Sequence, residues 1–508
     1  MPARDAPSGS QTPSSVTGVP GEFHASQHPH HNKRWTILVF VLIAQVVILL
    51  DATVVNVALP SAQKDLGFSD ANRQWVITAY VLAFGSLLPV GGRLSDLIGQ
   101  KAMFLTGLVG FALSSALGGA APDIGALVAS RALQGAFAAV LAPAALSLIA
   151  TSFSDRREAS KAFGLLGAVA GSAAVIGLIL GGVLTQYLDW RWCMYVNIVF
   201  AILGLFGGAR YLTNIRDERR PKISVSSALI GSLGVFGVVY GVSRAQIDAW
   251  SATATLVPLL VGAASIAAFV PLQRYSSYPL MPLRIFTDRN RGAAYLTLFL
   301  GNVAQFAIFL FLTYYFQGVL HYSPVKTGFA FVPLAAASAT SATFAQAKLI
   351  DKFSVRTIVS TGLIISAAGC ALLTRAGVGT DYAVVLPGLI LVGAGVGSAL
   401  VVSTANGLHG VAHEDAGAAG AINNVSQQLG SAFGVAFLST VAGTANSDYL
   451  ADHFGTPDAV VNATLHGFKV GYTWAVVILT AAAVFCGLLI HPKTYVHGKK
   501  QRPKMLQD

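Results

Sequence analysis

From Trp35 to about residue 491, the chain is a succession of long apolar stretches with few charged residues inside them. A helix needs about 20 apolar residues to cross the hydrocarbon core of a bilayer, and most of these stretches reach that length. Only 11% of the residues are charged, against about 25% in soluble domains. A disordered chain, a soluble enzyme and a nucleic-acid-binding protein are therefore excluded as first interpretations, and the sequence predicts an all-α integral membrane protein.

The apolar stretches predict fourteen transmembrane helices. A polar segment at 447–470 between the last two is expected to be the longest external loop. Residues 1–32 are rich in Pro, Ser, His and Gly, which predicts a disordered tail. The helices are expected at about 35–59, 72–92, 102–121, 124–152, 160–184, 193–213, 224–243, 253–273, 291–320, 325–347, 356–376, 382–406, 418–446 and 471–491.

The basic residues test this map, because the short cytoplasmic loops of membrane proteins are enriched in Lys and Arg. With the N-terminus in the cytoplasm, the cytoplasmic segments hold 25 of the 33 Lys and Arg residues, the external loops hold 7, and one, Arg131, is left inside a helix. Both termini are therefore expected in the cytoplasm. Topology then explains the net charge of +11, and no nucleic-acid partner is expected.

Two ionisable side chains lie inside predicted membrane helices, where charge is costly and is usually functional. Asp51 is in the first helix and Arg131 is in the fourth, where Gln134 shares its face. A buried carboxyl group beside a cation can be poised to gain and lose a proton, as a proton-coupled transporter requires. The alternative is a structural ion pair, or charges that face trapped water.

Uncharged polar side chains also recur at membrane depth. They can line a water-filled cavity or form hydrogen bonds between helices. The aromatic residues of the ninth predicted helix, between Phe306 and Phe316, could form an apolar wall for a substrate or could face lipid. The polar residues considered for a cavity are Asn302, Gln305, Asn424 and Gln428.

The segment after the second predicted helix reads GRLSDLIGQK from Gly92 to Lys101. Gly92 and Gly99 permit a tight turn and a close approach of helices. Asp96 can accept hydrogen bonds from an adjacent helix N-terminus, and the basic groups can form ion pairs. Such a latch would favour one of two conformations, although spacing alone is equally consistent with a plain interhelical loop.

This segment resembles the signature cytoplasmic loop of the major facilitator superfamily. The stretch LDATVVNVALP, which contains Asp51, is similar to the first-helix motif of the fourteen-helix branch of that superfamily, the drug:proton antiporters. RALQG, which begins at Arg131, resembles the fourth-helix motif, whose arginine is implicated in proton coupling. The other residues that match the first-, fourth- and fifth-helix motifs are Thr53, Asn56, Pro60, Gln134, Gly135, Gly177, Gly181 and Gly182.

Two positions depart from the fifth-helix motif. Leu178 stands where the family usually has Pro, and Ala173 stands where it often has Gly. Since proline bends helices, its absence should straighten this one. WRW at 190–192, followed by Asn197, also looks like this branch.

The resemblance implies the major facilitator fold, with two six-helix bundles, two additional central helices and alternating access to the two sides of the membrane. The expected segments are a cytoplasmic tail at 1–32, an N-terminal six-helix bundle at 33–215, two linker helices at 216–275, a C-terminal six-helix bundle at 276–492 and a basic cytoplasmic tail at 493–508.

The functional hypothesis is proton-coupled efflux of amphipathic drugs, dyes or antibiotics across a bacterial inner membrane, by a protein that is not an enzyme and acts as a monomer. No phosphate-binding loop is found, so the proton gradient is expected as the energy source, without a cofactor or a metal. The alternatives are proton-coupled uptake or export of one specific small metabolite, and a non-transporting membrane sensor on the same fold.

Overall fold

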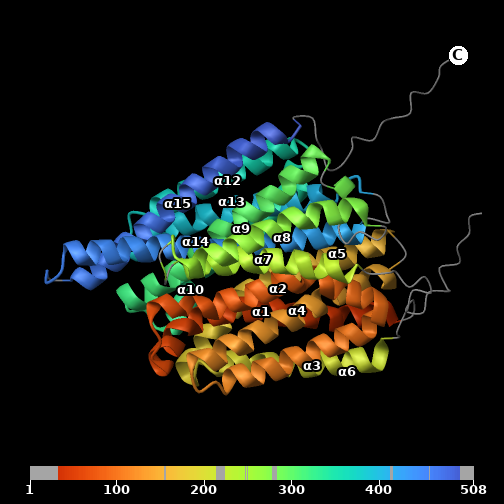
Figure 1. Cartoon of the computed structure of the whole chain (residues 1–508), viewed down its shortest axis with the longest axis horizontal. Helices are drawn as coiled ribbons and strands as arrows, with labels where there is room; N and C mark the ends of the chain where they lie inside the picture. Colours follow the sequence, from red (N-terminus) through yellow and green to blue (C-terminus); the bar gives the residue numbers. More distant parts are fainter. Residues whose placement is uncertain are drawn as a thin grey trace, which may run out of the picture.

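The computed structural model is built from long helices that run side by side (Figure 1). The expected tails at 1–32 and 493–508 lie outside the residues that the structure describes. The described residues are 33–153, 156–212, 224–245, 248, 250–276, 283–285, 287–411, 416–456 and 458–491.

Fourteen long helical segments follow one another in the described part of the chain, which confirms the predicted all-α architecture. Twelve of them are long and apolar enough to cross a membrane, and α5 and α14 complete the set. The π-helical turn η4 (Tyr315–Val319) extends α9, and α10, α11 and the π-helical turn η5 (Ala345–Leu349) form one interrupted segment. The bounds are α1 Arg34–Leu66, α2 Asp70–Ile98, α3 Gln100–Gly119, α4 Ile124–Ser152, α5 Arg156–Tyr187, α6 Trp192–Tyr211, α7 Val225–Arg244, α8 Thr253–Tyr275, a 3-10 turn η3 Leu283–Ile285, α9 Arg289–Tyr314, α10 Pro324–Ala330, α11 Val332–Phe344, α12 Val355–Leu373, α13 Tyr382–Leu408, α14 Ala416–Asp452 and α15 Ala459–Leu489.

The first six helices and the last group repeat one packing pattern. In the first bundle, α4 packs against α2 and α3, α1 packs against α5, and α6 packs against α1 and α3. In the second bundle, α13 packs against α11 and α12, α9 packs against α14, and α15 packs against α9 and α12. The α10–α11 segment is therefore the structural equivalent of α2, and α9 and α13 are the equivalents of α1 and α4.

The α7–α8 pair lies between the bundles in sequence and over the junction between them in space (Figure 1). The two helices pack closely, because Gly237 of α7 and Gly262 of α8 face each other without intervening side chains. α7 also contacts both α2 and α14, and the Ser232 hydroxyl donates a hydrogen bond to the Ser86 carbonyl oxygen of α2 over 2.6 Å. α8 contacts α7 and leaves Leu260 66% exposed, as expected for a lipid-facing helix.

Three hydrogen bonds among the described residues join the two bundles, and all lie near the α1–α2 and α5–α6 turns. The Tyr314 hydroxyl of α9 donates to Gln63 Oε1 of α1 over 2.6 Å. Gln317 Nε2 donates to the Val57 carbonyl oxygen over 2.9 Å. The amide of Val325 at the start of α10 donates to Gln186 Oε1 of α5 over 3.2 Å. We refer to this end of the molecule as the closed end.

Several helices extend beyond the predicted boundaries. α1 continues through Pro60 to Leu66, because an interior proline removes one backbone hydrogen bond without ending the helix, and it stops at Gly67 with φ of 65°. The prediction of a long loop at 447–470 is wrong, because most of that segment belongs to α14 and α15. The predicted boundary followed the loss of apolar residues, whereas helices can continue past a bilayer into water.

Most aromatic residues at the end of α9 and in η4 are buried where their side chains are described, whereas Tyr314 is partly exposed. Phe311 and Phe316 are buried in the apolar core of the second bundle. The ring of Phe311 lies 5.3 Å from that of Phe468, and the ring of Phe316 lies 5.6 Å from that of Phe331. Phe311 and Phe316 therefore fit neither alternative considered from the sequence, because a membrane helix can also bury aromatic residues against its own bundle.

The α7–α8 contact gives a test of this packing. A side chain at Gly262 would collide with the backbone of α7, since an added Cβ would lie 2.5 Å from the Val238 amide nitrogen. We expect Gly262→Val to lower the thermal unfolding temperature of the solubilised protein, because overpacking costs about 1–3 kcal/mol. Gly420→Ala is the control, since nothing lies within 4 Å of its added methyl group. Equal unfolding temperatures for the two variants would contradict the close α7–α8 contact.

Candidate functional site

Asp51 lies in the middle of α1, and its side chain is completely shielded from solvent. The residues before it are Ile48, Leu49 and Leu50, so the carboxylate belongs to an otherwise apolar helix. A carboxylate buried in this way needs a positive charge and hydrogen-bond donors from neighbouring helices.

Arg131 of α4 supplies the positive charge. Its Nη1 donates to Asp51 Oδ2 over 2.6 Å, and Arg131 is 1% exposed. Its Nε donates to the Val76 carbonyl oxygen of α2 over 3.1 Å. The guanidinium also lies 4.4 Å from the centre of the Tyr80 ring, which is a cation–π contact. The two charges predicted from the sequence therefore form one buried ion pair.

Three further polar side chains complete the arrangement. Gln134 Oε1 accepts a hydrogen bond from Arg131 Nη1 over 2.7 Å. Gln134 Nε2 donates a hydrogen bond to Asp51 Oδ1 over 3.2 Å. Gln134 Nε2 also donates to Ser115 Oγ of α3 over 2.7 Å. Asn197 of α6 donates from Nδ2 to Asp51 Oδ1 over 2.7 Å. We call Asp51, Arg131, Gln134, Asn197 and Ser115 the Asp51 network.

The Asp51 network joins four helices around one carboxylate. Oδ2 accepts from Arg131, and Oδ1 accepts from Gln134 and Asn197. The Asn197 Oδ1 atom is buried without a hydrogen-bond partner. The network therefore pairs both carboxylate oxygens with donors from neighbouring helices.

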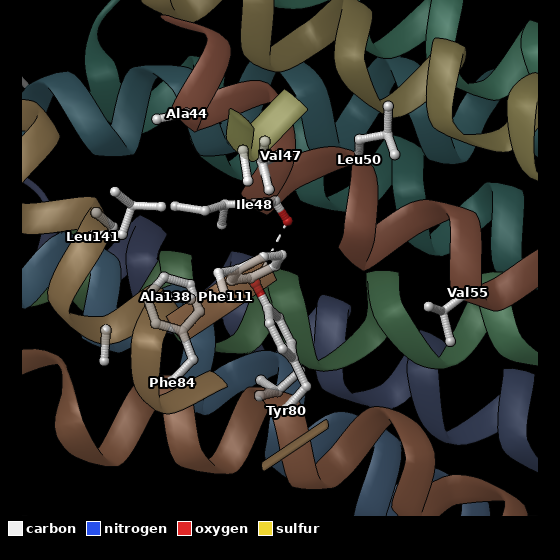
Figure 2. Close-up of a cluster of buried hydrophobic side chains, with 14 of the residues drawn as sticks. Ala44, Val47, Ile48, Leu50, Val55, Tyr80, Phe84, Phe111, Ala138 and Leu141 are labelled. Atoms are coloured by element: carbon white, nitrogen blue, oxygen red, sulfur yellow. Dashed lines mark hydrogen bonds between the residues drawn. The ribbon is translucent and has the colours of Figure 1, made fainter. Parts of the chain in front are cut away.

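Apolar packing isolates the network from water. Figure 2 shows Tyr80, Phe84, Phe111 and Ala138 grouped beside α1, with the Tyr80 hydroxyl directed at the Ile48 carbonyl oxygen over 3.5 Å. On the way to the closed end, a space of about 10 Å³ is left among apolar side chains, which is at the lower limit for one water molecule. That space is lined by Val55, Ala58, Leu59, Ala62, Val76, Leu127, Trp190 and Met194.

The other residues of the first-helix motif do not contact Asp51. The Thr53 hydroxyl donates to the Leu50 carbonyl oxygen over 3.0 Å, and Asn56 Nδ2 donates to the Ala52 carbonyl oxygen over 2.9 Å. Pro60 lies further along α1, beyond the network. These residues shape the helix that carries the carboxylate rather than the hydrogen bonds around it.

Glycines of the motifs allow helices to approach the network closely. A Cβ atom added at Gly177 of α5 would lie 2.0 Å from Thr53 Oγ1, and one at Gly181 would lie 2.9 Å from the Val54 carbonyl oxygen. On α4, a Cβ at Gly135 would lie 2.2 Å from the Tyr80 carbonyl oxygen of α2. The backbones of α1 and α2 are therefore held against α5 and α4 beside Asp51 and Arg131.

Glycines also let α5 meet α10 across the two bundles. A Cβ at Gly182 would lie 2.5 Å from the Pro324 carbonyl oxygen, and a Cβ at Gly328 would lie 2.5 Å from that of Leu178. Leu178, which stands where the family usually has Pro, lies within the continuous helix α5. Leu178 itself is buried at this contact.

The predicted loop motif is mostly helical. α2 continues to Ile98, and the turn is Gly99 alone, whose φ of 111° favours glycine. Lys101 Nζ donates to the carbonyl oxygens of Ala209 and Leu212 at the end of α6, over 3.0 and 2.7 Å. Gly92 lies within α2, and a Cβ atom added to it would lie 3.8 Å from the Cβ atom of Pro143. The side chain of Asp96 lies outside the described part of the structure. Lys101 therefore fastens two helices of one bundle.

The residues considered for a cavity have different surroundings. Asn302 is buried and donates to the Leu298 carbonyl oxygen of its own helix over 2.8 Å. Gln428 of α14 faces α2, since a Cβ atom added at Gly85 of α2 would lie 3.3 Å from the Cβ atom of Gln428. Gln305 and Asn424 are partly exposed. Among the described residues, no hydrogen bond joins one of these four side chains to another.

A second charged cluster lies at the closed end. Asp65 Oδ2 accepts hydrogen bonds from Trp190 Nε1 over 3.0 Å and from Arg191 Nη1 over 2.5 Å. Burial would lower the pKa of the Arg191 guanidinium, but the hydrogen bond and charge of Asp65 outweigh it and raise that pKa. This cluster ties the end of α1 to the turn between α5 and α6.

The sequence singled out Asp51, Arg131 and Gln134 but gave no prediction for Ser115. Asn197 was noticed only as part of a motif. A signal for Ser115 exists, since Ser114 and Ser115 form a polar pair inside the apolar α3. The sequence contains no information on which side of α3 this pair faces.

Comparison with known proteins places this arrangement in a class of membrane transporters. The family model of the major facilitator superfamily matches residues 41–435. The chain is 45% identical over 482 residues to the puromycin resistance protein pur8 of Streptomyces alboniger, covering 94% of this chain and 95% of that one. It is 35% identical over 459 residues to the cephamycin export protein CmcT of Amycolatopsis lactamdurans, covering 87% and 92%.

Solved structures show the same fold. A bacterial homologue of the human lysosomal transporter Spinster, in an inward-facing and occupied conformation, superposes with a TM-score of 0.61 at 16% sequence identity, covering 90% of this chain and 96% of that one. The chain belongs to the major facilitator superfamily. It is a multi-pass membrane protein built on the transporter fold of that family.

The network gives a testable energetic prediction. Arg131→Met would leave the Asp51 carboxylate buried without a cation, and breaking a buried ion pair in this way costs about 3–5 kcal/mol. We expect Arg131→Met to lower the thermal unfolding temperature strongly, and Asp51→Asn in the same chain to restore most of it. Unfolding temperatures of the single and double variants in one detergent measure this coupling. A double variant as unstable as the sum of both single effects would show that the two side chains are independent.

Proposed function

We propose that this protein exports amphipathic antibiotics or related drugs across the bacterial cell membrane in exchange for protons. The names of its relatives support the substrate class, since one confers puromycin resistance and another exports cephamycin. The similarity covers 95% of the first relative and 92% of the second.

The Asp51 network is the observation that carries proton coupling. The carboxylate is fully buried and is held by Arg131, Gln134 and Asn197. A proton on Asp51 neutralises the carboxylate, so Arg131 loses its anionic partner and keeps only its two neutral acceptors, Gln134 and the Val76 carbonyl oxygen. The helices α1, α2, α4 and α6 then shift relative to one another, and the change of charge becomes a change of conformation.

The contacts between the bundles support an inward-facing conformation. The closed end carries the α1–α2 and α5–α6 turns, which the distribution of basic residues assigns to the external side of the membrane. Both termini are then cytoplasmic. In the export cycle, the substrate binds between the bundles from the cytoplasmic side, and the closed end opens to release it.

The proton gradient supplies the energy in this proposal, without a bound cofactor. One chain contains both bundles and the complete Asp51 network, so a monomer suffices for transport. The uptake of one metabolite is the competing function, and the direction of flux under an imposed pH gradient separates it from export.

Asp51→Asn tests the coupling. The amide keeps the size of the side chain but cannot carry a proton in exchange, so we expect substrate-triggered proton release from everted vesicles to disappear. A pH-sensitive dye reports the release as puromycin and a panel of other antibiotics and dyes are added. Asp123→Asn is the control, because Asp123 caps the start of α4 through its Oδ1 and Asn also caps helices well. Full activity of inserted Asp51→Asn protein would overturn the assignment.

The closed end gives a second test. Export requires α5 and α10 to separate, so we expect a short thiol cross-link between Gln186→Cys and Val325→Cys to stop export and its reduction to restore it. The three native cysteines are first replaced by Ala. The control is Gln100→Cys with Thr151→Cys, whose native side chains are in contact over 3.1 Å within the first bundle. Continued export by fully cross-linked Gln186–Val325 protein would show that this end does not open.

A further inference from the structure

The two junctions between the bundles are covered differently. At one junction, α2 meets α14, and α7 packs against both of them. At the other, α5 meets α10 closely at the closed end, where Gly182 and Gly328 permit backbone contact. The repeat makes α11 the equivalent of α2, but no helix takes the place of α7 over α11 in the described part of the chain.

The uncovered face of α11 forms a groove. Residues on the opposite face, including Leu334, Ser338 and Ser341, approach the glycines of α13. The groove is wide open to its surroundings and has a volume of about 420 Å³. Its described lining is Ala339, Thr340, Thr343, Phe344, Ala347 and Lys348.

The wall of this groove is effectively apolar along its length. The hydroxyl groups of Thr340 and Thr343 donate to the carbonyl oxygens of Ala336 and Ala339 of their own helix, each over 2.8 Å. They are therefore not available as donors to a ligand. The side chain of Phe344 is 50% exposed, although it is large and apolar. Such a wall suits a hydrocarbon chain better than a polar molecule.

Lys348 ends the groove with a positive charge. It lies in the π-helical turn η5, is exposed, and has its Nζ 5.7 Å from the centre of the Phe344 ring. No carboxylate lies within ion-pair distance of Lys348 among the residues that the structure describes. Lys352 and Arg356 follow in the next turns of the chain, and the three basic residues outnumber the one acid there, Asp351, so this end of α11 has a net positive charge.

We propose that this groove binds an anionic phospholipid, with one acyl chain along α11 and the headgroup phosphate on Lys348. Nine helical steps separate Ala339 from Lys348, which gives about 13 Å, close to half of the ~30 Å hydrocarbon thickness and therefore to one leaflet. The charge complementarity selects phosphatidylglycerol over a zwitterionic lipid such as phosphatidylcholine. This proposal does not depend on the transported substrate or on proton coupling.

The test measures lipid retained by the purified full-length protein. The protein is extracted in mild detergent, exchanged into phosphatidylglycerol or phosphatidylcholine, and weighed intact by native mass spectrometry. We expect the wild type to retain phosphatidylglycerol and Lys348→Gln to bind it about fivefold more weakly. This is the loss of affinity expected when one basic residue near an anionic lipid surface loses its charge. Lys326→Gln is the matched control, since Lys326 lies on α10 over the Tyr322 ring, away from the groove. It should match the wild type.

A second variant addresses the apolar wall. Ala347→Trp fills the groove without changing its charge, so we expect weaker retention of both lipids. The proposal is wrong if Lys348→Gln retains phosphatidylglycerol as well as the wild type does, or if the wild type has no preference between the two lipids. It is also wrong if added puromycin displaces the retained lipid while added phosphatidylglycerol does not. The groove would then be a drug site.

Discussion

A carboxylate and a guanidinium held away from water determine how the first bundle is built. Asp51 and Arg131 can share a bilayer core only if their remaining hydrogen-bonding groups find partners, and these come from α2, α3 and α6 as well as from α1 and α4. Close helix contacts follow from the same requirement, since Gly135 and Gly177 bring backbones next to the pair. Hydrogen bonding and small residues therefore act together, as expected where lipid provides no hydrophobic driving force between helices.

The repeat of the fold is not a repeat of its chemistry. α9 and α13 take the places of α1 and α4, yet α13 has no charged residue and α9 has charges only at its start. The core of the second bundle consists of aromatic and aliphatic side chains. The two bundles therefore differ in polarity, because the buried Asp51–Arg131 ion pair belongs to the first bundle alone among the described residues. The α7–α8 pair adds a second asymmetry, because α7 covers only one of the two junctions.

The sequence predicted the architecture because apolar length and charge distribution follow directly from the bilayer. It also identified Asp51 and Arg131, since isolated charges in apolar helices are conspicuous. It failed at helix ends, where α14 and α15 continue past the apolar residues, and on the α9 aromatic residues, whose burial depends on neighbours such as Phe468. Ser115 could not be placed, because the direction that a side chain faces across a bundle depends on packing between distant segments.

The Asp51 network also has a consequence for the synthesis of this protein. Asp51 is made early, while Arg131 follows 80 residues later and Asn197 follows 146 residues later. At about 5–20 residues per second, the carboxylate waits about 7–30 s for its last partner. During that interval α1 carries an acidic group without its cation, so it is poorly suited to lipid on its own. If α1 stays beside the insertion machinery until α6 emerges, Asp51 meets lipid only together with its partners, and this cost is avoided.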